Sequence, residues 1–274
     1  MGYEQVLYEH RQIKRGGIEM AQAKKHMGLG IILAISFWIV LFLMFSPIFP
    51  KTKAGAPQNG LQWADELFNE LAKGSSYFIP KAQKNNEKFM GKMFSLSIKV
   101  SKAEDKPGEG EKRAERASKL FMLNPGAKVE VNGAELKIEG DLGLVLKAAL
   151  DDSDFMFKNE GDKIKAKYAE AMKTDDVKQM YRQWNNVLSK IDKAFKKEGK
   201  IEEANMVSEV LKKAVEASYN FYGVEPKAVK DEAALMTFLL VFYVAYTMWW
   251  GFAIFYIFEG LGLSMKKAKV KKEV

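Results

Sequence analysis

Two long apolar segments dominate the pattern of hydrophobic and polar positions along this chain. The first covers about 27–49 and the second about 233–258, and neither contains a charged side chain. A run of roughly 20 apolar residues can cross the hydrocarbon core of a membrane as one helix. The pattern therefore predicts two transmembrane helices that bracket a polar segment, 50–232.

The polar segment contains several stretches with a helical period. Apolar residues that share one helical face predict helices over about 61–73 and 81–93. Further along, Asp141 is placed to cap a helix over 142–150. From Asp162 onward, an apolar stripe to Phe195, the turn residue Gly199 and a second stripe over 201–222 predict a long helical hairpin.

Between these helices the pattern changes to the alternation of a strand. Residues 94–101 alternate apolar and polar side chains, and so do those around Asn132-Gly133. An Asn-Gly pair favours a tight turn, so we expect a hairpin over about 127–139, joined by the 94–101 strand. The charged stretch 102–118 indicates an exposed loop that runs into a short helix. The expected fold class is an α-helical membrane protein with two transmembrane helices and a mainly α extracytoplasmic domain, α+β in detail, with a small antiparallel sheet.

The ends of the first span can also be predicted. Before it, Gly16-Gly17 is expected to interrupt a short, weakly amphipathic helix. After it, Pro47 and Pro50 are expected to stop the span, because proline cannot continue the helical hydrogen-bond ladder. Ala54-Gly55-Ala56 resembles a signal-peptide cleavage site. The apolar run is longer than a signal core and Pro57 follows the site directly, so we expect an uncleaved anchor.

Basic residues predict the orientation of the spans. Arg and Lys side chains, Lys24 and Lys25 among them, precede the first span, and a lysine cluster over 266–272 follows the second. Such residues stay on the cytoplasmic side and favour anionic lipid headgroups. We expect a double-pass protein of the cytoplasmic (inner) membrane with both termini cytoplasmic. The segments are a tail over 1–26, a span over 27–49, an extracytoplasmic domain over 50–232, a span over 233–258 and a basic tail over 259–274.

The composition limits which ligands and reactions this chain can support. The net charge is +8, but the polar segment mixes Lys with Glu and Asp as a solvated surface does, so no nucleic acid is expected. There is no cysteine, and the two histidines, His10 and His26, both lie in the N-terminal tail. Thiol catalysis and histidine or cysteine ligation of a metal or haem in the outer domain are excluded. We expect a protein that is not an enzyme, with no cofactor, catalytic residue or metal site.

One acidic cluster invites a metal interpretation. Asp151, Asp152 and Asp154 offer oxygen ligands, but the glycine and distal glutamate of an EF-hand loop are missing. We interpret the cluster as a solvated end of the 142–150 helix.

The second span carries the candidate interface. Tyr246, Trp249 and Trp250 fall near its middle, where indole and hydroxyl groups need partners that lipid does not offer. Gly251 would allow a close helix approach. The sequence predicts packing against other transmembrane helices, with a flat apolar cofactor such as a quinone as the less favoured alternative.

Glu259 is the acidic residue at the end of that span. An intramembrane carboxylate is a functional hypothesis by default. Because the second span returns to the cytoplasmic side, Glu259 should lie level with Lys24, Lys25 and His26. We expect an interfacial ion pair of Glu259 with Lys24 and Lys25 rather than ion translocation.

These observations favour a non-catalytic structural or accessory subunit of a multi-protein membrane complex. Its partners would be other integral membrane proteins or further copies of the chain. Two alternatives remain open: a two-span sensor or receptor that signals through a partner, and a small oligomeric channel or transporter that uses Glu259.

Overall fold

The computed structural model describes residues 3–52, 54–101 and 104–263, with side chains from Met20 onward. Its contacts divide the chain into two units. The long-helix unit comprises Met1–Phe68 and Val229–Val274, and the globular unit comprises Asn69–Ala228. The basic cluster over 266–272, on which half of the predicted orientation rests, lies outside the described residues.

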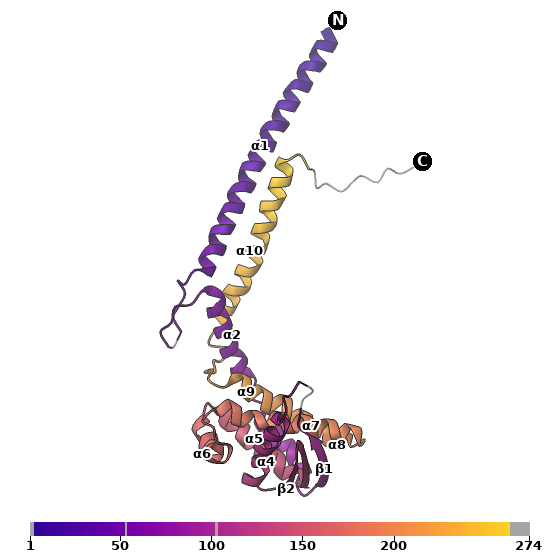
Figure 1. Ribbon diagram of the computed structural model, residues 1–274. Helices are drawn as coiled ribbons and strands as arrows, with labels where there is room; N and C mark the ends of the chain where they lie inside the picture. The colour runs from indigo at the N-terminus through magenta and orange to yellow at the C-terminus, as the bar shows by residue number, and fades with distance from the viewer. Residues whose placement is uncertain (1–2, 53, 102–103, 264–274) are drawn as a thin grey trace, which may run out of the picture. The chain divides into compact units, whose positions relative to one another are not determined.

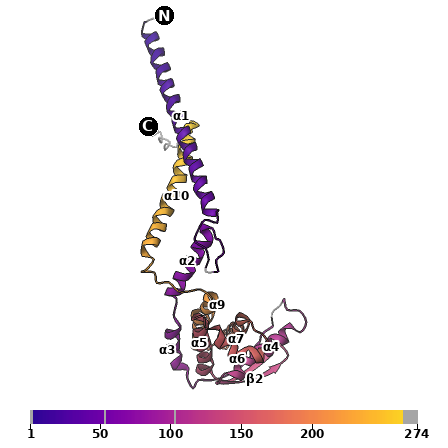
Figure 2. The ribbon, with the colours of Figure 1, turned by 90° about the vertical axis from the view of Figure 1, so that its left-hand side faces the viewer.

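The long-helix unit is built from α1 (Tyr3–Phe45) and α10 (Ala233–Gly260), which run side by side (Figure 1; Figure 2). Within them, Met20–Phe45 and Ala233–Gly260 have mean hydropathies of 2.6 and 1.8 and are long and apolar enough to cross a membrane. The first of these apolar helices ends at Phe45, before Pro47, as expected. The predicted interruption at Gly16-Gly17 is wrong, because α1 continues through both glycines.

The chain enters the globular unit through α2 (Gly60–Ser75). Asn59 and Gln62 cap its start reciprocally: the Gln62 N–H donates to Asn59 Oδ1 at 3.0 Å, and the Asn59 N–H donates to Gln62 Oε1 at 3.0 Å. This pair satisfies amide groups that the first helical turn leaves free. The helix predicted over 61–73 is confirmed.

Helices make up most of the globular unit, and a small sheet completes it. In chain order the elements are α3 (Ile79–Asn86), the 3₁₀ helix η1 (Glu87–Phe89), β1 (Met93–Lys99), α4 (Glu109–Leu123), β2 (Ala127–Asn132), β3 (Glu135–Asp141), α5 (Leu142–Phe157), α6 (Gly161–Met172), α7 (Val177–Lys197), α8 (Ile201–Val210), the π-helix η2 (Leu211–Glu216) and α9 (Ala217–Phe221).

The predicted three-stranded antiparallel sheet is confirmed, in the order β1-β3-β2. Leu96 pairs with Ile138, and Ile138 with Val129, so one apolar face is continuous across the strands. The hairpin turn differs by one residue from the expectation. Asn132 still pairs with Glu135, and the two-residue loop begins at Gly133, whose φ of +56° suits glycine.

The core lies between the apolar face of the sheet and the surrounding helices. α5 is its central helix, and α3 packs against α5 on one side (Figure 2). Trp184, Tyr168 and Tyr181 are the largest fully buried aromatic side chains.

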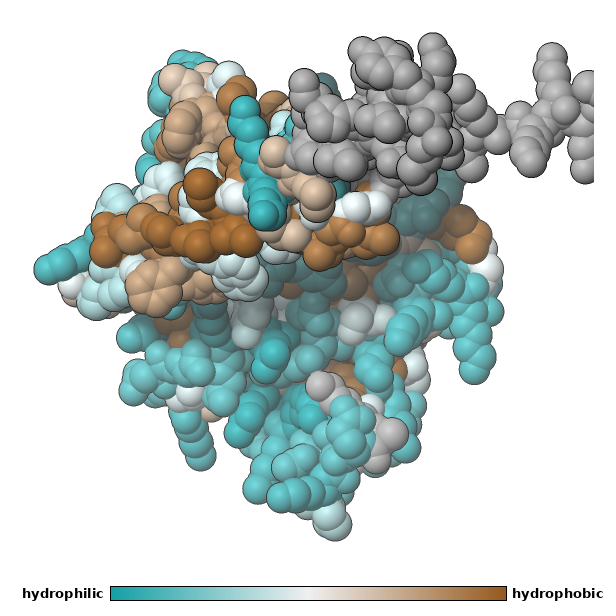
Figure 3. Space-filling view, turned by 90° about the horizontal axis from the view of Figure 1, so that it is seen from above, coloured by the Kyte–Doolittle hydropathy of each residue, from teal (hydrophilic) through white to brown (hydrophobic). Residues whose placement is uncertain are grey.

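In the space-filling view, hydrophobic residues gather over one part of the visible face and hydrophilic residues cover most of the rest (Figure 3).

Two helix predictions changed in length. Residues 81–93 form a shorter helix, α3, followed by η1 and the start of β1. The helix after Asp141 begins as predicted, with the Leu144 N–H donating to Asp141 Oδ1 at 3.2 Å, but it continues to Phe157. The acidic cluster therefore lies on the helix and not beyond its end. The hairpin of α7 and α8 turns at Gly199, with φ +75°, as expected.

Candidate functional site

The mid-span aromatic residues of α10 contact α1 of the same chain. Tyr246 stacks on Phe37 with ring centroids 4.2 Å apart, and its hydroxyl donates to the Phe37 carbonyl at 3.4 Å. Trp249 Nε1 donates to the Leu33 carbonyl at 3.2 Å. Trp250 lies 4.7 Å from the Phe37 ring, between centroids. These polar groups thus have partners inside the chain, and they do not by themselves require an external helix.

Small residues allow this contact, but Gly251 is not one of them. A Cβ on Gly30 would lie 2.7 Å from the Ile257 nitrogen, and a Cβ on Gly260 would lie 2.7 Å from Met27 Cα. Ala253 is fully buried on the same side of α10. Gly251 is exposed and a Cβ there would meet nothing within 4 Å. The close helix approach is therefore made at Gly30 and Gly260.

Glu259 is paired at the end of the helix pair. His26 Nδ1 lies 2.7 Å from Glu259 Oε2, and the His26 ring meets the edge of Tyr256 at 5.5 Å between centroids. Among the described residues no ion pair joins Glu259 to Lys24 or Lys25, which are both exposed. The structure thus brings Glu259 to the start of the first span, with the histidine as its partner.

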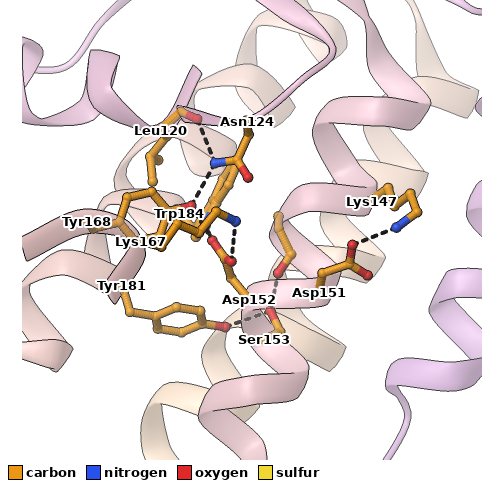
Figure 4. A network of polar contacts seen from close by, with 11 residues as sticks. Leu120, Asn124, Lys147, Asp151, Asp152, Ser153, Lys167, Tyr168, Tyr181 and Trp184 are labelled. Atoms are coloured by element: carbon orange, nitrogen blue, oxygen red, sulfur yellow. Dashed lines mark hydrogen bonds and ion pairs between the residues drawn. The ribbon is translucent and has the colours of Figure 1, made fainter. Parts of the chain in front are cut away.

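In the globular unit the acidic cluster divides into separate contacts. Asp151 pairs with Lys147 at 2.6 Å on the surface, whereas Asp154 accepts from the Tyr77 hydroxyl at 2.5 Å and pairs with Lys158. Figure 4 shows Asp151 and Asp152 pointing to opposite sides of α5. No group of three or more acidic, histidine or cysteine side chains within the described residues could hold a metal ion.

Asp152 is fully buried, contrary to the expected solvated position. Its Oδ1 pairs with Lys167 Nζ at 2.7 Å, and its Oδ2 accepts from Trp184 Nε1 at 2.7 Å and from the Tyr168 hydroxyl (Figure 4). Asn124 Nδ2 in turn donates to the Tyr168 oxygen at 2.7 Å. Buried carboxylates persist when paired and hydrogen-bonded in this way.

The Asp152 cluster, defined by Asp152, Lys167, Tyr168 and Trp184, joins α5, α6 and α7. Burial raises the pKa of Tyr168, and the neighbouring Asp152 charge raises it further. The neutral phenol therefore stays a donor at any physiological pH. The geometry holds three helices together, and Tyr181, which donates to Ser153 Oγ at 2.6 Å, adds a second polar link between α7 and α5.

A second buried charge, Lys73, joins the segments by which the chain enters and leaves the globular unit. Lys73 Nζ donates to Asn159 Oδ1 at 3.0 Å, to the Phe221 carbonyl at 3.1 Å and to the Val224 carbonyl at 2.6 Å. Burial lowers the pKa of Lys73, and the charge of Glu225 opposes that shift. All three ammonium protons have acceptors, so this lysine is a structural tie and not a free nucleophile.

Beside it, Lys227 strengthens the same junction. Its N–H donates to the Glu70 carbonyl at 3.0 Å and its ammonium lies 2.8 Å from Glu70 Oε2. Gly74 is needed here, since a Cβ would lie 2.0 Å from the Lys227 carbonyl oxygen. The entry and exit segments are therefore fastened to each other within the globular unit.

An open groove of about 950 Å³ lies at one end of the sheet. All three strands line it, through Met93, Glu139 and Ala127 among others, and Lys200 after α7 completes the lining. Met93 is 73% exposed and is the exposed apolar side chain of this lining, beside the exposed polar side chains of Ser95, Lys128 and Glu139. Exposed methionine is common on surfaces that bind proteins, because its side chain adapts to different partners. The sequence did not single out this groove, since it forms only when the strands are assembled.

Comparison of the chain with protein-family models, curated proteins and solved structures finds no match. The functional argument therefore rests on the contacts described above.

Proposed function

We propose that this chain is a double-pass membrane protein that acts as a non-catalytic accessory subunit of a membrane complex. In this proposal α1 and α10 anchor it, both termini are cytoplasmic, and residues 50–232 lie outside the cytoplasm. The groove beside Met93 carries the proposal, because an exposed methionine surrounded by polar and charged side chains is the arrangement of an apolar contact with a polar rim, which suits a protein partner.

The long-helix unit plays a different part in this proposal from the one predicted from sequence. Tyr246, Trp249 and Trp250 pack inside the chain, so α10 serves first as one half of an anchor. Glu259, on which the channel alternative rests, is engaged with His26. In this proposal that pair gives the carboxylate a structural role, in place of the ion pathway of the channel alternative.

The orientation is tested by single-cysteine labelling, for which the cysteine-free chain is a ready background. In sealed vesicles of known orientation, a membrane-impermeant maleimide should label Lys112→Cys, at an exposed position of α4, from the extracytoplasmic side. Gln12→Cys, before the first span, should react only after permeabilisation. The opposite labelling, or labelling of both positions from one side, would refute the orientation.

Partner binding is tested at the groove. A tagged chain purified in mild detergent should bring down a partner in a fixed ratio, and Met93→Glu should remove it, because a charge would be buried in an apolar contact. Met122→Glu changes another exposed methionine, 59% exposed and outside the groove lining, and this matched control should retain the partner. A chain that purifies alone, or that loses its partner equally in both variants, would contradict the proposal.

A further inference from the structure

The last helix of the globular unit contains a π-helical segment. α8 is followed directly by η2 (Leu211–Glu216) and then by α9, so the wider turn interrupts one otherwise continuous helix. Such segments are rare and occur frequently at functional sites. This one changes the phase of the residues after it and faces α7.

A pocket of about 260 Å³ lies between the π segment and α7. Its inner wall is formed by Tyr181 and Val215, which are both buried. Around its mouth stand Arg182 and Asn185 from α7, with Glu216 and Tyr219 from the other helix. Pockets for drug-sized ligands measure about 300–1,000 Å³, so this one suits a smaller molecule.

Charges of both signs, Arg182 and Glu216, line this pocket, and Lys178 lies just outside the lining. Arg182 Cζ lies 5.6 Å and Lys178 Nζ lies 5.2 Å from the centroid of the Tyr219 ring. Both cations thus lie against the same ring, and neither forms an ion pair with a carboxylate within the part of the chain that the structure describes. Glu216 accepts only a long hydrogen bond from Asn185 Nδ2, at 3.5 Å. A guanidinium and a carboxylate therefore line one small cavity without contacting each other.

We propose that this pocket binds a small zwitterion of the α-amino-acid class. The planar fork of Arg182 matches a carboxylate, and Lys178, which lies over the Tyr219 ring outside the lining, adds positive charge nearby. Glu216 accepts from the ammonium group, and Asn185 offers an amide to either. The ligand side chain rests against Tyr219 and Val215. The pocket shares no lining residue with the groove beside Met93, so the inference stands apart from the proposed accessory function.

The test uses the full chain purified in detergent and the common amino acids, added singly. Ligand that binds only the folded state raises the melting temperature, and calorimetry then gives its Kd. The best binder is compared with its own carboxamide and its own N-acetyl derivative. Each derivative removes one charge, so each should bind at least about tenfold more weakly, because a site built for a polar group rejects an analogue that lacks it.

Variants locate the site. Arg182→Gln and Glu216→Gln should each weaken binding at least about tenfold, since both side chains are exposed and their replacement leaves the fold intact. Arg116→Gln, an exposed arginine on α4, is the matched control and should bind as the wild type does. No melting shift with any amino acid at about 10 mM would overturn the inference. So would binding that survives both variants, or binding of the N-acetyl derivative at full strength.

Discussion

Asp152→Ala is expected to destabilise the globular unit by about 3–5 kcal/mol, the usual effect of removing one partner of a buried ion pair. The lost stability comes mainly from two donors of Asp152 that cannot bind water instead, because Trp184 is 1% exposed and Tyr168 is fully buried. Each would keep an N–H or O–H without its acceptor, which costs about 1–3 kcal/mol. Lys167, which is 27% exposed, can turn to solvent and contributes less.

The measurement is thermal unfolding of the full chain in detergent, followed by near-ultraviolet circular dichroism. For a unit of this size, each 1 kcal/mol lowers Tm by about 2–4 °C, so Asp152→Ala should lower it by roughly 6–20 °C. Asp151→Ala is the matched control one residue away. It removes only the exposed ion pair with Lys147 and should change stability by at most about 0.5 kcal/mol. Equal melting of the two variants would refute the structural role of Asp152.

Asp152 also shows why the sequence predicted the fold of the globular unit better than its polar interior. The sheet, the Asp141 cap and the α7–α8 hairpin depend on patterns of neighbouring residues, so the sequence was sufficient to predict them. The sequence interpretation places the three carboxylates at the end of a helix. The buried face of α5 nonetheless continues past them, from Ala149 to Met156. Asp152 lies on that same buried face. Its donors come from α6 and α7, so no local pattern could name them.

The face of α10 that contacts α1 could not be predicted from hydropathy. The side chains of α10 are apolar on every face of the helix, so their hydropathy does not distinguish the face that contacts α1. Spacing can: Tyr246, Trp250, Ala253, Ile257 and Gly260 follow each other at three or four residues and form the observed contact face. Gly251 is off that series. Its predicted contact with another helix stays a prediction, whereas Gly30 and Gly260 allow the close approach within the chain.

Gly30→Leu is expected to separate the two long helices. A Cβ at residue 30 would lie 2.7 Å from the Ile257 nitrogen and 3.1 Å from the Ala253 carbonyl oxygen. Both are backbone atoms, so no rotamer change can relieve the clash and α10 itself must move. Overpacking of this kind destabilises the folded state by about 1–3 kcal/mol. The distance between the axes of packed helices is about 8–10 Å and increases with the size of the side chains at the contact.

Spin labels on Leu29→Cys and Phe258→Cys, two exposed positions of the cysteine-free chain, report the separation in reconstituted bilayers by pulsed electron resonance. Gly30→Leu should lengthen the mean distance by roughly 2 Å and broaden its distribution. It should also change the fluorescence of Trp249, whose indole loses the Leu33 carbonyl. Gly28→Leu is the matched control, because a Cβ there meets nothing within 4 Å. An unchanged distance in Gly30→Leu would show that the helices do not pack through this glycine. An equal change in Gly28→Leu would show that added bulk anywhere on α1, and not the contact with Ile257, moves the helices.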